Sequence, residues 1–285
     1  MTTVEAVVLA VVEGLTEFLP VSSTGHMILT ESLMKMQRST LTNVFIVNIQ
    51  FGAILSVLFL YRKRFFQGLN FYLKLFVGFI PAGICGYFLN DKIDRLLSSV
   101  FTVAVSLVIG GIALIVADII FRKQIENIPI DEDLATFKEP NEFGIEVTRE
   151  VQLLNVTWLQ SFIIGLFQPI AMLPGVSRSA ITIIGGLTQK FSIKKAAEFS
   201  FFLGVPTISV AATYKLVNVY DMIKGQDIDL LILGNVVSFI VGMLAIRFFL
   251  DLIAKYGLKF FGYYRIALGV TILVLMALGH KLDIN

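Results

Sequence analysis

Polar side chains that could do chemistry gather in one short stretch near the N-terminus. Residues 13–26 read EGLTEFLPVSSTGH, with two carboxylates, three consecutive hydroxyl residues and a histidine. Glu13 and Glu17 are spaced i, i+4 and share one helix face. Two adjacent carboxylates repel unless one is protonated or a cation lies between them, and their oxygens suit a hard divalent cation such as Mg²⁺ or Ca²⁺. We predict such a cation at Glu13 and Glu17; the alternative is carboxylates at the membrane interface or paired with buried lysines.

The hydroxyl cluster follows Pro20, where a new helix is expected to begin. Ser22, Ser23, Thr24 and Gly25 supply hydroxyls, backbone N–H groups and a flexible glycine. This combination suits an anion at a helix N-terminus. Serine and threonine are also ordinary N-cap residues, so capping is the alternative interpretation.

His26 lies three residues beyond Ser23. A hydroxyl nucleophile with a neighbouring imidazole is a common activated pair. The histidine could instead attack phosphorus itself or act as the general acid for a leaving group. Ser23 and His26 are therefore competing catalytic candidates, whereas His280, near the C-terminal end, is expected to have no role.

A second polar stretch repeats the first and adds an arginine. Residues 174–182 read PGVSRSAIT. The Arg178 guanidinium is a good bidentate phosphate ligand, and the alternative is a buried ion pair with Glu17 or another carboxylate. We predict that both stretches bind one phosphate group together. The expected substrate-binding residues are Ser22, Thr24, Gly25, Gly175, Ser177, Arg178, Ser179 and Thr182.

The composition indicates which solvent surrounds these motifs. Of 285 residues, 56% are hydrophobic and 15% charged, and the mean hydropathy is +0.82. Soluble domains are less apolar and more charged, so we predict an integral membrane protein in contact with membrane lipids. A net charge of +2 without a continuous basic patch indicates no nucleic-acid partner. The single cysteine, Cys85, excludes a disulfide framework.

Apolar runs of about 20 residues can cross the bilayer. Residues 4–34 and 155–188 are also apolar, but proline, glycine and serine interrupt them. Because irregular backbone at membrane depth must be buried or line a wet cavity, we predict re-entrant helical hairpins there; kinked full spans are the alternative. Residues 122–154 are expected to form a cytoplasmic loop. The six predicted spans lie near 43–61, 74–90, 98–121, 196–216, 230–250 and 263–280.

Weak internal repetition predicts how these elements are arranged. Residues 14–17, GLTE, resemble residues 165–168, GLFQ. One membrane domain, 1–285, would then hold two halves, 1–121 and 155–285, each with a re-entrant hairpin and three spans. Because three is odd, the second half starts at the opposite face, which makes an all-α inverted repeat whose broken loops meet near the midplane.

Basic residues set the expected orientation. Four connections are basic, at residues 62–74, 122–123, 190–195 and 255–259, and we predict that they face the cytoplasm. Both termini then lie outside, and the first hairpin enters from the outer face. The glycine pairs at 110–111 and 185–186 permit close helix contact, within one chain or between the subunits of a homodimer.

The two motifs together resemble the paired signature of the undecaprenyl-diphosphate phosphatase family, also called BacA or UppP. The similarity continues through the span pattern and residues 197–206, AEFSFFLGVP. It implies hydrolysis of a polyprenyl diphosphate, undecaprenyl diphosphate, to undecaprenyl phosphate and inorganic phosphate. It also implies recycling of the cell-wall lipid carrier at the outer side of the bacterial cytoplasmic (inner) membrane, and resistance to bacitracin.

The resemblance also implies roles for individual residues. In this family the glutamates matching Glu13 and Glu17 are associated with a divalent cation, and the arginine matching Arg178 with the diphosphate. Residues matching Ser23 and His26 are candidate nucleophiles, and direct attack by water stays open. The alternative function is a secondary transporter or flippase of an anionic lipid or solute, because inverted repeats with broken helices are typical of transporters.

Overall fold

The structure of the protein is a computed structural model. It describes residues 1–36, 39–62, 68–96, 99–122, 134–140, 146–152, 156–219, 221, 223 and 225–279. His280 and parts of the loop 122–154 lie outside the described residues.

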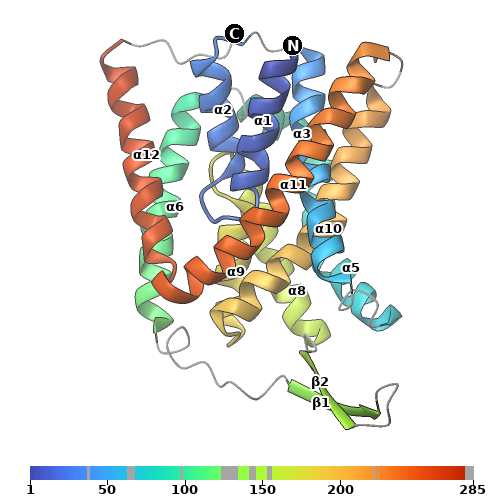
Figure 1. Ribbon diagram of the computed structural model, residues 1–285. Helices are drawn as coiled ribbons and strands as arrows, with labels where there is room; N and C mark the ends of the chain where they lie inside the picture. Colours follow the sequence, from blue (N-terminus) through green and yellow to red (C-terminus); the bar gives the residue numbers. More distant parts are fainter. Residues whose placement is uncertain are drawn as a thin grey trace.

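The chain folds into a bundle of apolar helices (Figure 1). In the described ranges, six helices are long and apolar enough to cross a membrane, and they coincide with the six predicted spans. Large hydrophobic side chains such as Ile119 and Leu244 are exposed on the outside of the bundle, as lipid-facing residues are. The all-α polytopic membrane fold is confirmed. The six helices are α3 (Thr40–Leu60), α5 (Leu69–Leu96), α6 (Val100–Ile120), α10 (Ile193–Asn218), α11 (Gly225–Tyr256) and α12 (Lys259–Ala277).

Both broken segments form helical hairpins. The first pairs α1 (Thr3–Thr16) with α2 (Ser23–Leu33), and the second joins α8 (Trp158–Phe167) and a 3₁₀ turn, η1 (Gln168–Met172), to α9 (Arg178–Thr188). In Figure 1, α1 and α2 occupy the upper half of the bundle and α8 and α9 the lower half. Each hairpin begins and ends on the same side of the bundle, as a re-entrant hairpin would, and its place in the membrane stays a prediction.

Helix neighbours follow a symmetric pattern. Helix α1 packs on α11 as α8 packs on α5, while α6 packs on α12 and α3 on α10. Suppose that α1, α3, α5 and α6 correspond, in this order, to α8, α10, α11 and α12. The α1–α11 contact then has the α8–α5 contact as its counterpart, and the α6–α12 and α3–α10 contacts each join two corresponding helices. An inverted repeat would produce this pattern, and the repeat itself stays a prediction.

The helix ends that flank the four basic connections lie at the face opposite the N-terminus (Figure 1). Between α6 and α8, the described residues form a hairpin at this face, which was not predicted from the sequence. Its strands β1 (Leu134–Pro140) and β2 (Glu146–Gln152) pair antiparallel. β-branched residues are frequent in β2, at Val147, Thr148 and Val151, which favours an extended backbone there. One face is thus marked by basic residues, and its assignment to the cytoplasm stays a prediction.

The predicted glycine contacts occur within one chain. A Cβ at Gly111 would lie 2.7 Å from the Gly262 carbonyl oxygen, so these glycines let α6 approach α12. A Cβ at Gly186 would lie 2.7 Å from the Ala196 Cβ, where α9 meets α10. These glycine pairs therefore serve intrachain packing, and a homodimer stays a prediction.

Asp118, near the end of α6, fixes the start of α12. Its Oδ2 accepts hydrogen bonds from the backbone N–H groups of Leu258, at 2.6 Å, and Lys259, at 3.0 Å. A carboxylate at a helix N-terminus satisfies orphan donors and complements the helix dipole. Asp118 thereby joins two helices that are far apart in the sequence.

We expect Asp118→Ala to lower the free energy of unfolding by about 1–2 kcal/mol, because the cap of α12 is lost. Asp118→Asn keeps one acceptor oxygen, so its free energy of unfolding should fall less than that of Asp118→Ala. Unfolding in mixed micelles, followed by circular dichroism, measures both. Asp251→Asn, at an exposed position on α11, is the control, and equal stability of all variants would contradict the capping role.

Candidate active site

Two strained serines end the breaks in the hairpins. Ser22 and Ser177 cap α2 and α9 with φ angles of 74° and 72°. Their hydroxyls accept from the N–H groups of Gly25, at 3.3 Å, and Ala180, at 3.2 Å. Positive φ is unfavourable for serine and persists only where surrounding contacts enforce it. The capping interpretation is confirmed for Ser22, Ser177 caps α9 in the same way, and both broken loops have the same local geometry.

The Glu17 carboxylate joins the two hairpins. Ser23 Oγ donates to Glu17 Oε2 at 2.7 Å, and Arg178 Nη2 donates to Glu17 Oε1 at 2.9 Å. Ser23 and Arg178 are the first residues of α2 and α9. Ser179 Oγ also donates to the Leu19 carbonyl oxygen at 2.9 Å. The predicted convergence of the two broken loops is confirmed.

Arg178 is held from the opposite side by α10. Its Nη1 donates to the Ser200 carbonyl oxygen at 2.7 Å, and a Cβ at Gly204 would collide with the same nitrogen. Thr182 is buried on α9 and donates to the Arg178 carbonyl oxygen at 2.7 Å. The ion pair with Glu17, which the sequence analysis kept as the alternative, is present; phosphate binding by Arg178 stays a prediction.

Glu13 carries the most unusual carboxylate among the described residues. It is fully buried one helical turn before Glu17, and neither of its oxygens has a hydrogen-bond partner in the described part of the chain. A bare buried carboxylate is costly, so it must hold a proton or a cation. The described ranges contain no cluster of three or more His, Cys, Asp or Glu residues suited to a metal. A cation here would complete its shell with other oxygen atoms.

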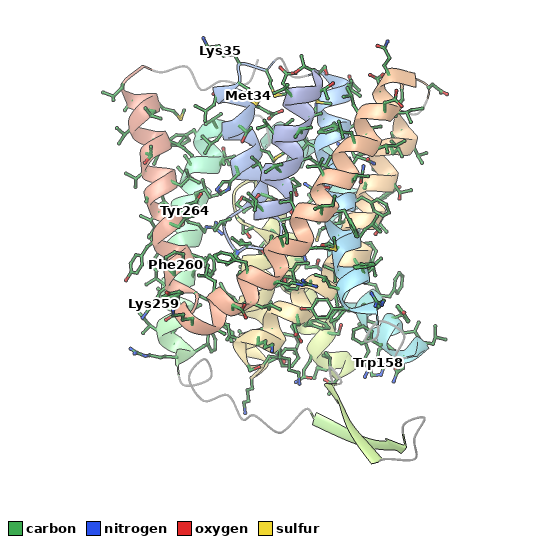
Figure 2. All side chains as sticks on the ribbon, viewed as in Figure 1. Met34, Lys35, Trp158, Lys259, Phe260 and Tyr264 are labelled. Carbon is green, nitrogen blue, oxygen red and sulfur yellow. The ribbon has the colours of Figure 1, made fainter. Side chains whose placement is uncertain are left out.

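His26 is turned away from Ser23. Its Nδ1 lies 2.8 Å from the Ser22 carbonyl oxygen, and its Nε2 lies 2.7 Å from the hydroxyl of Tyr264. Because a carbonyl oxygen can only accept, Nδ1 carries the proton of the neutral ring, and Nε2 accepts a hydrogen bond from the Tyr264 hydroxyl. Tyr264 lies on α12 (Figure 2). The two rings are stacked with an interplanar angle of 4°. The structure pairs Ser23 with Glu17 instead of His26.

A cavity of about 620 Å³ opens beside the joined loops. Its polar lining, called the polar end below, includes Glu17, Ser23 and Arg178 of the joined loops. Its apolar lining, called the apolar wall, comes mainly from α5, η1 and α10. This shape suits a ligand with an anionic head and an apolar body. The polar end also includes Ser22, Thr24, Gly175 and Ser177, and the apolar wall includes Phe79, Ala82, Met172, Ile208, Val210 and Ala211. Gln50, Gln168, Thr207 and Lys215 also line the cavity.

Not every expected binding residue lines this cavity. Gly25, Ser179 and Thr182 do not, nor do Glu13 and His26. The N–H group of Gly25 is used by the Ser22 cap, Ser179 ties the two loops, and Thr182 supports Arg178. These residues hold the loops in place.

Three polar residues around the site, Gln168, Arg265 and Tyr264, were not predicted from the sequence. Buried Gln168 donates to the Gly78 carbonyl oxygen at 2.8 Å and accepts from Thr207 at 2.9 Å. The sequence repeat could have identified Gln168, because it occupies the position of Glu17 in the repeated motif. The signal for Arg265 was a charge inside an apolar span. Tyr264 had no sequence signal beyond lying next to Arg265.

Comparisons with known proteins agree over almost the whole chain. Residues 6–271 match the family model described as bacitracin resistance protein BacA. The undecaprenyl-diphosphatase of Bdellovibrio bacteriovorus is 47% identical, over 99% of both chains. The undecaprenyl-diphosphatase of Flavobacterium johnsoniae is 48% identical over the full length of both chains. The undecaprenyl-diphosphatase of Aquifex aeolicus is 39% identical, over 95% of this chain and 97% of its own.

The Glu17–Arg178 ion pair should show strong coupling in a double-mutant cycle. Glu17→Gln or Arg178→Gln alone leaves one charge uncompensated at membrane depth and should lower the free energy of unfolding by about 3 kcal/mol. The double variant should cost less than the sum of the two single variants by at least about 1 kcal/mol. Unfolding in mixed micelles measures the cycle. Purely additive losses would show that the two charges do not stabilise each other.

Proposed function

The chain belongs to the bacitracin resistance protein BacA family, and we propose that it hydrolyses undecaprenyl diphosphate to undecaprenyl phosphate and inorganic phosphate. This reaction recycles the lipid carrier of bacterial cell-wall synthesis and confers resistance to bacitracin. The observation that carries the proposal is the placement of Glu17, Ser23 and Arg178 at the polar end of a cavity with an apolar wall.

We infer that the diphosphate lies at the polar end of the cavity. Arg178 supplies a positive charge there, and the N-termini of α2 and α9 begin at the same place. Helix N-termini and guanidinium groups both favour phosphate. The apolar wall receives the start of the prenyl chain. The chain then leaves the bundle past Val210 and Tyr214, which are exposed on α10.

We propose Ser23 as the nucleophile and Glu17 as its base. Ser23 Oγ already donates its proton to Glu17 Oε2. As Oγ attacks the terminal phosphorus, Glu17 takes this proton, the bond to the bridging anhydride oxygen breaks, and undecaprenyl phosphate leaves. Water then hydrolyses the phosphoserine and releases phosphate. His26, bound to Tyr264 outside the cavity lining, is less well placed to attack.

We also propose that Glu13 and Glu17 hold a divalent cation, Mg²⁺ or Ca²⁺. The support is the fully buried Glu13 carboxylate, whose two oxygens lack a donor in the described part of the chain. When bound, the cation would neutralise charge on the diphosphate. Carboxylate oxygens are the ligands that both ions prefer.

The protein is a multi-pass membrane protein, and we propose that it lies in the bacterial inner membrane with the cavity open to the outer side. The cavity is lined by residues near the middle of α3 and α5 and in the second half of α10, whose end lies toward the face of the N-terminus (Figure 1). If the basic connections are cytoplasmic, this face is the outer one. We also propose that 1–121 and 155–285 form an inverted repeat and that the protein forms a homodimer.

A transporter or flippase is not favoured. The relatives carry the name of a phosphatase. Binding an anion also does not require a hydroxyl that is hydrogen-bonded to a carboxylate, as Ser23 is to Glu17, whereas an activated nucleophile does. Lipid transfer across liposomes without phosphate release would contradict the proposed hydrolysis.

Purified protein should release phosphate from a C55 lipid diphosphate. We expect Ser23→Ala and Glu17→Gln to lower kcat by at least about 1,000-fold, because the nucleophile or its base is lost. His26→Gln should lower kcat by less than about 10-fold, because its ring contacts Tyr264 and not Ser23. Thr30→Ala, which removes another hydroxyl from α2, is the matched control.

A quenched turnover with labelled substrate identifies the intermediate of this reaction. Acid-stable phosphoserine, absent from Ser23→Ala, is expected. An acid-labile phosphohistidine would assign the attack to His26, and the absence of any adduct would assign it to water.

Glu13→Gln should abolish stabilisation by a divalent cation. A bound ligand raises the unfolding temperature by mass action, so Mg²⁺ or Ca²⁺ should raise Tm of the wild-type protein. Glu13→Gln keeps the side-chain volume but removes the charge, and its Tm should not respond. Asp229→Asn, exposed on α11, is the control. An unchanged response in Glu13→Gln would show that this carboxyl holds a proton instead of a cation.

A further inference from the structure

A second arginine, Arg265 on α12, is buried among the broken loops. Its side chain is fully buried although α12 is an apolar span. Among the described residues it forms no ion pair; its guanidinium donates to backbone carbonyl oxygens instead. The acceptors are Pro20 (3.2 Å) and Val176 (2.9 Å) for Nη1, Gly175 (2.7 Å) and Ser106 (3.3 Å) for Nη2, and Leu107 (3.5 Å) for Nε.

Three of these acceptors belong to the breaks in the hairpins. Pro20 precedes Ser22 by two residues, and Gly175 and Val176 directly precede Ser177. Where a helix breaks, its carbonyl groups lose their helical partners, and at membrane depth bulk water cannot replace them. The planar fork of Arg265 satisfies carbonyls of both breaks at once. One side chain therefore connects the first hairpin, the second hairpin, α6 and α12.

This contact also fixes the direction of the peptide groups on the cavity side. A trans peptide points its N–H opposite to its C=O, and the described chain has no cis peptide bond. The Val176 carbonyl faces Arg265, so the N–H of Ser177 points away from the guanidinium. Ser177 lines the cavity, whereas Arg265 does not. The guanidinium thus lies behind the loop whose other side faces the ligand.

We infer that Arg265 is a positioning residue of the phosphatase site. It holds the two broken loops in register from behind and so places Ser23, Arg178 and the loop N–H groups around the diphosphate. This inference rests on the proposed function, but it concerns a residue that touches neither the cavity nor the Glu17 carboxylate.

Gly110 on α6 offers a way to disturb Arg265 without removing it. A Cβ at Gly110 would collide with Arg265 Nη2 and would also approach its Cζ, at 2.8 Å. Gly110→Ala should therefore push the guanidinium off the Gly175 carbonyl oxygen. Gly225, at the start of α11, has no atom near its Cβ position, so Gly225→Ala is the matched control for adding one methyl group.

The test compares steady-state phosphate release by Arg265→Gln, Arg265→Lys, Gly110→Ala and Gly225→Ala. We expect kcat of Arg265→Gln and Gly110→Ala to fall about 100-fold, because the reacting groups are misplaced. KM should change less than about threefold, because the prenyl chain still fills the same apolar wall. Arg265→Lys keeps the charge and some of the donors, so its kcat should lie between those of the wild type and Arg265→Gln. Gly225→Ala should match the wild type.

Hydrogen exchange of the purified variants separates positioning from a general loss of structure. In Arg265→Gln, amides of the two breaks, residues 17–25 and 173–180, should exchange faster, while those of α3 should not change. Wild-type kcat in either Arg265→Gln or Gly110→Ala would overturn the inference, as would faster exchange throughout the bundle. Failure of the wild-type protein to release phosphate would instead overturn the proposed function, so the two failures are distinguishable.

Discussion

The site depends on one carboxylate that two hairpins share. One Glu17 oxygen accepts a hydrogen bond from Ser23, and the other accepts one from Arg178. The two donors occupy the same place in their helices, the first residue after a strained serine cap. Glu17 lies at membrane depth, where an unpaired charge would be costly. The two hydrogen bonds that compensate the Glu17 charge also bring a hydroxyl, a carboxylate and a guanidinium together in the cavity lining.

Breaking two helices inside a membrane leaves backbone groups without partners, and the surrounding elements supply replacements. The capping serines accept hydrogen bonds from backbone N–H groups. Ser179 donates to a carbonyl oxygen of the opposite loop, and Arg265 donates to carbonyl oxygens of both loops. Gly175 has a φ of 89°, and a Cβ there would lie 2.7 Å from the Val103 carbonyl oxygen. Glycine is therefore required where the second loop meets α6. The rigid spans thus hold an irregular centre in a fixed shape.

Hydrophobic patterning was sufficient to predict the six spans, because the membrane requires long apolar helices. The convergence of the broken loops followed from motif repetition. Local spacing failed at His26: its neighbour Tyr264 is 238 residues away, so no count along the chain could place them together. Arg265 was visible as a charge in a span, but its acceptors are backbone groups that no sequence motif identifies. The cavity lining likewise depends on the packing of α3, α5 and α10, and the strands of the long loop were not predicted.

Gln168 shows that the two broken segments are alike in shape but not in chemistry. At the position where the first segment has the Glu17 carboxylate, the second has an amide whose two ends are occupied by Gly78 and Thr207. An amide cannot accept a proton at neutral pH. Only the first segment therefore supplies a carboxylate to the joined loops, where it pairs with Arg178 of the second segment. The proposed proton acceptor therefore occurs once, although the broken segment that carries it has a similar counterpart in the second hairpin.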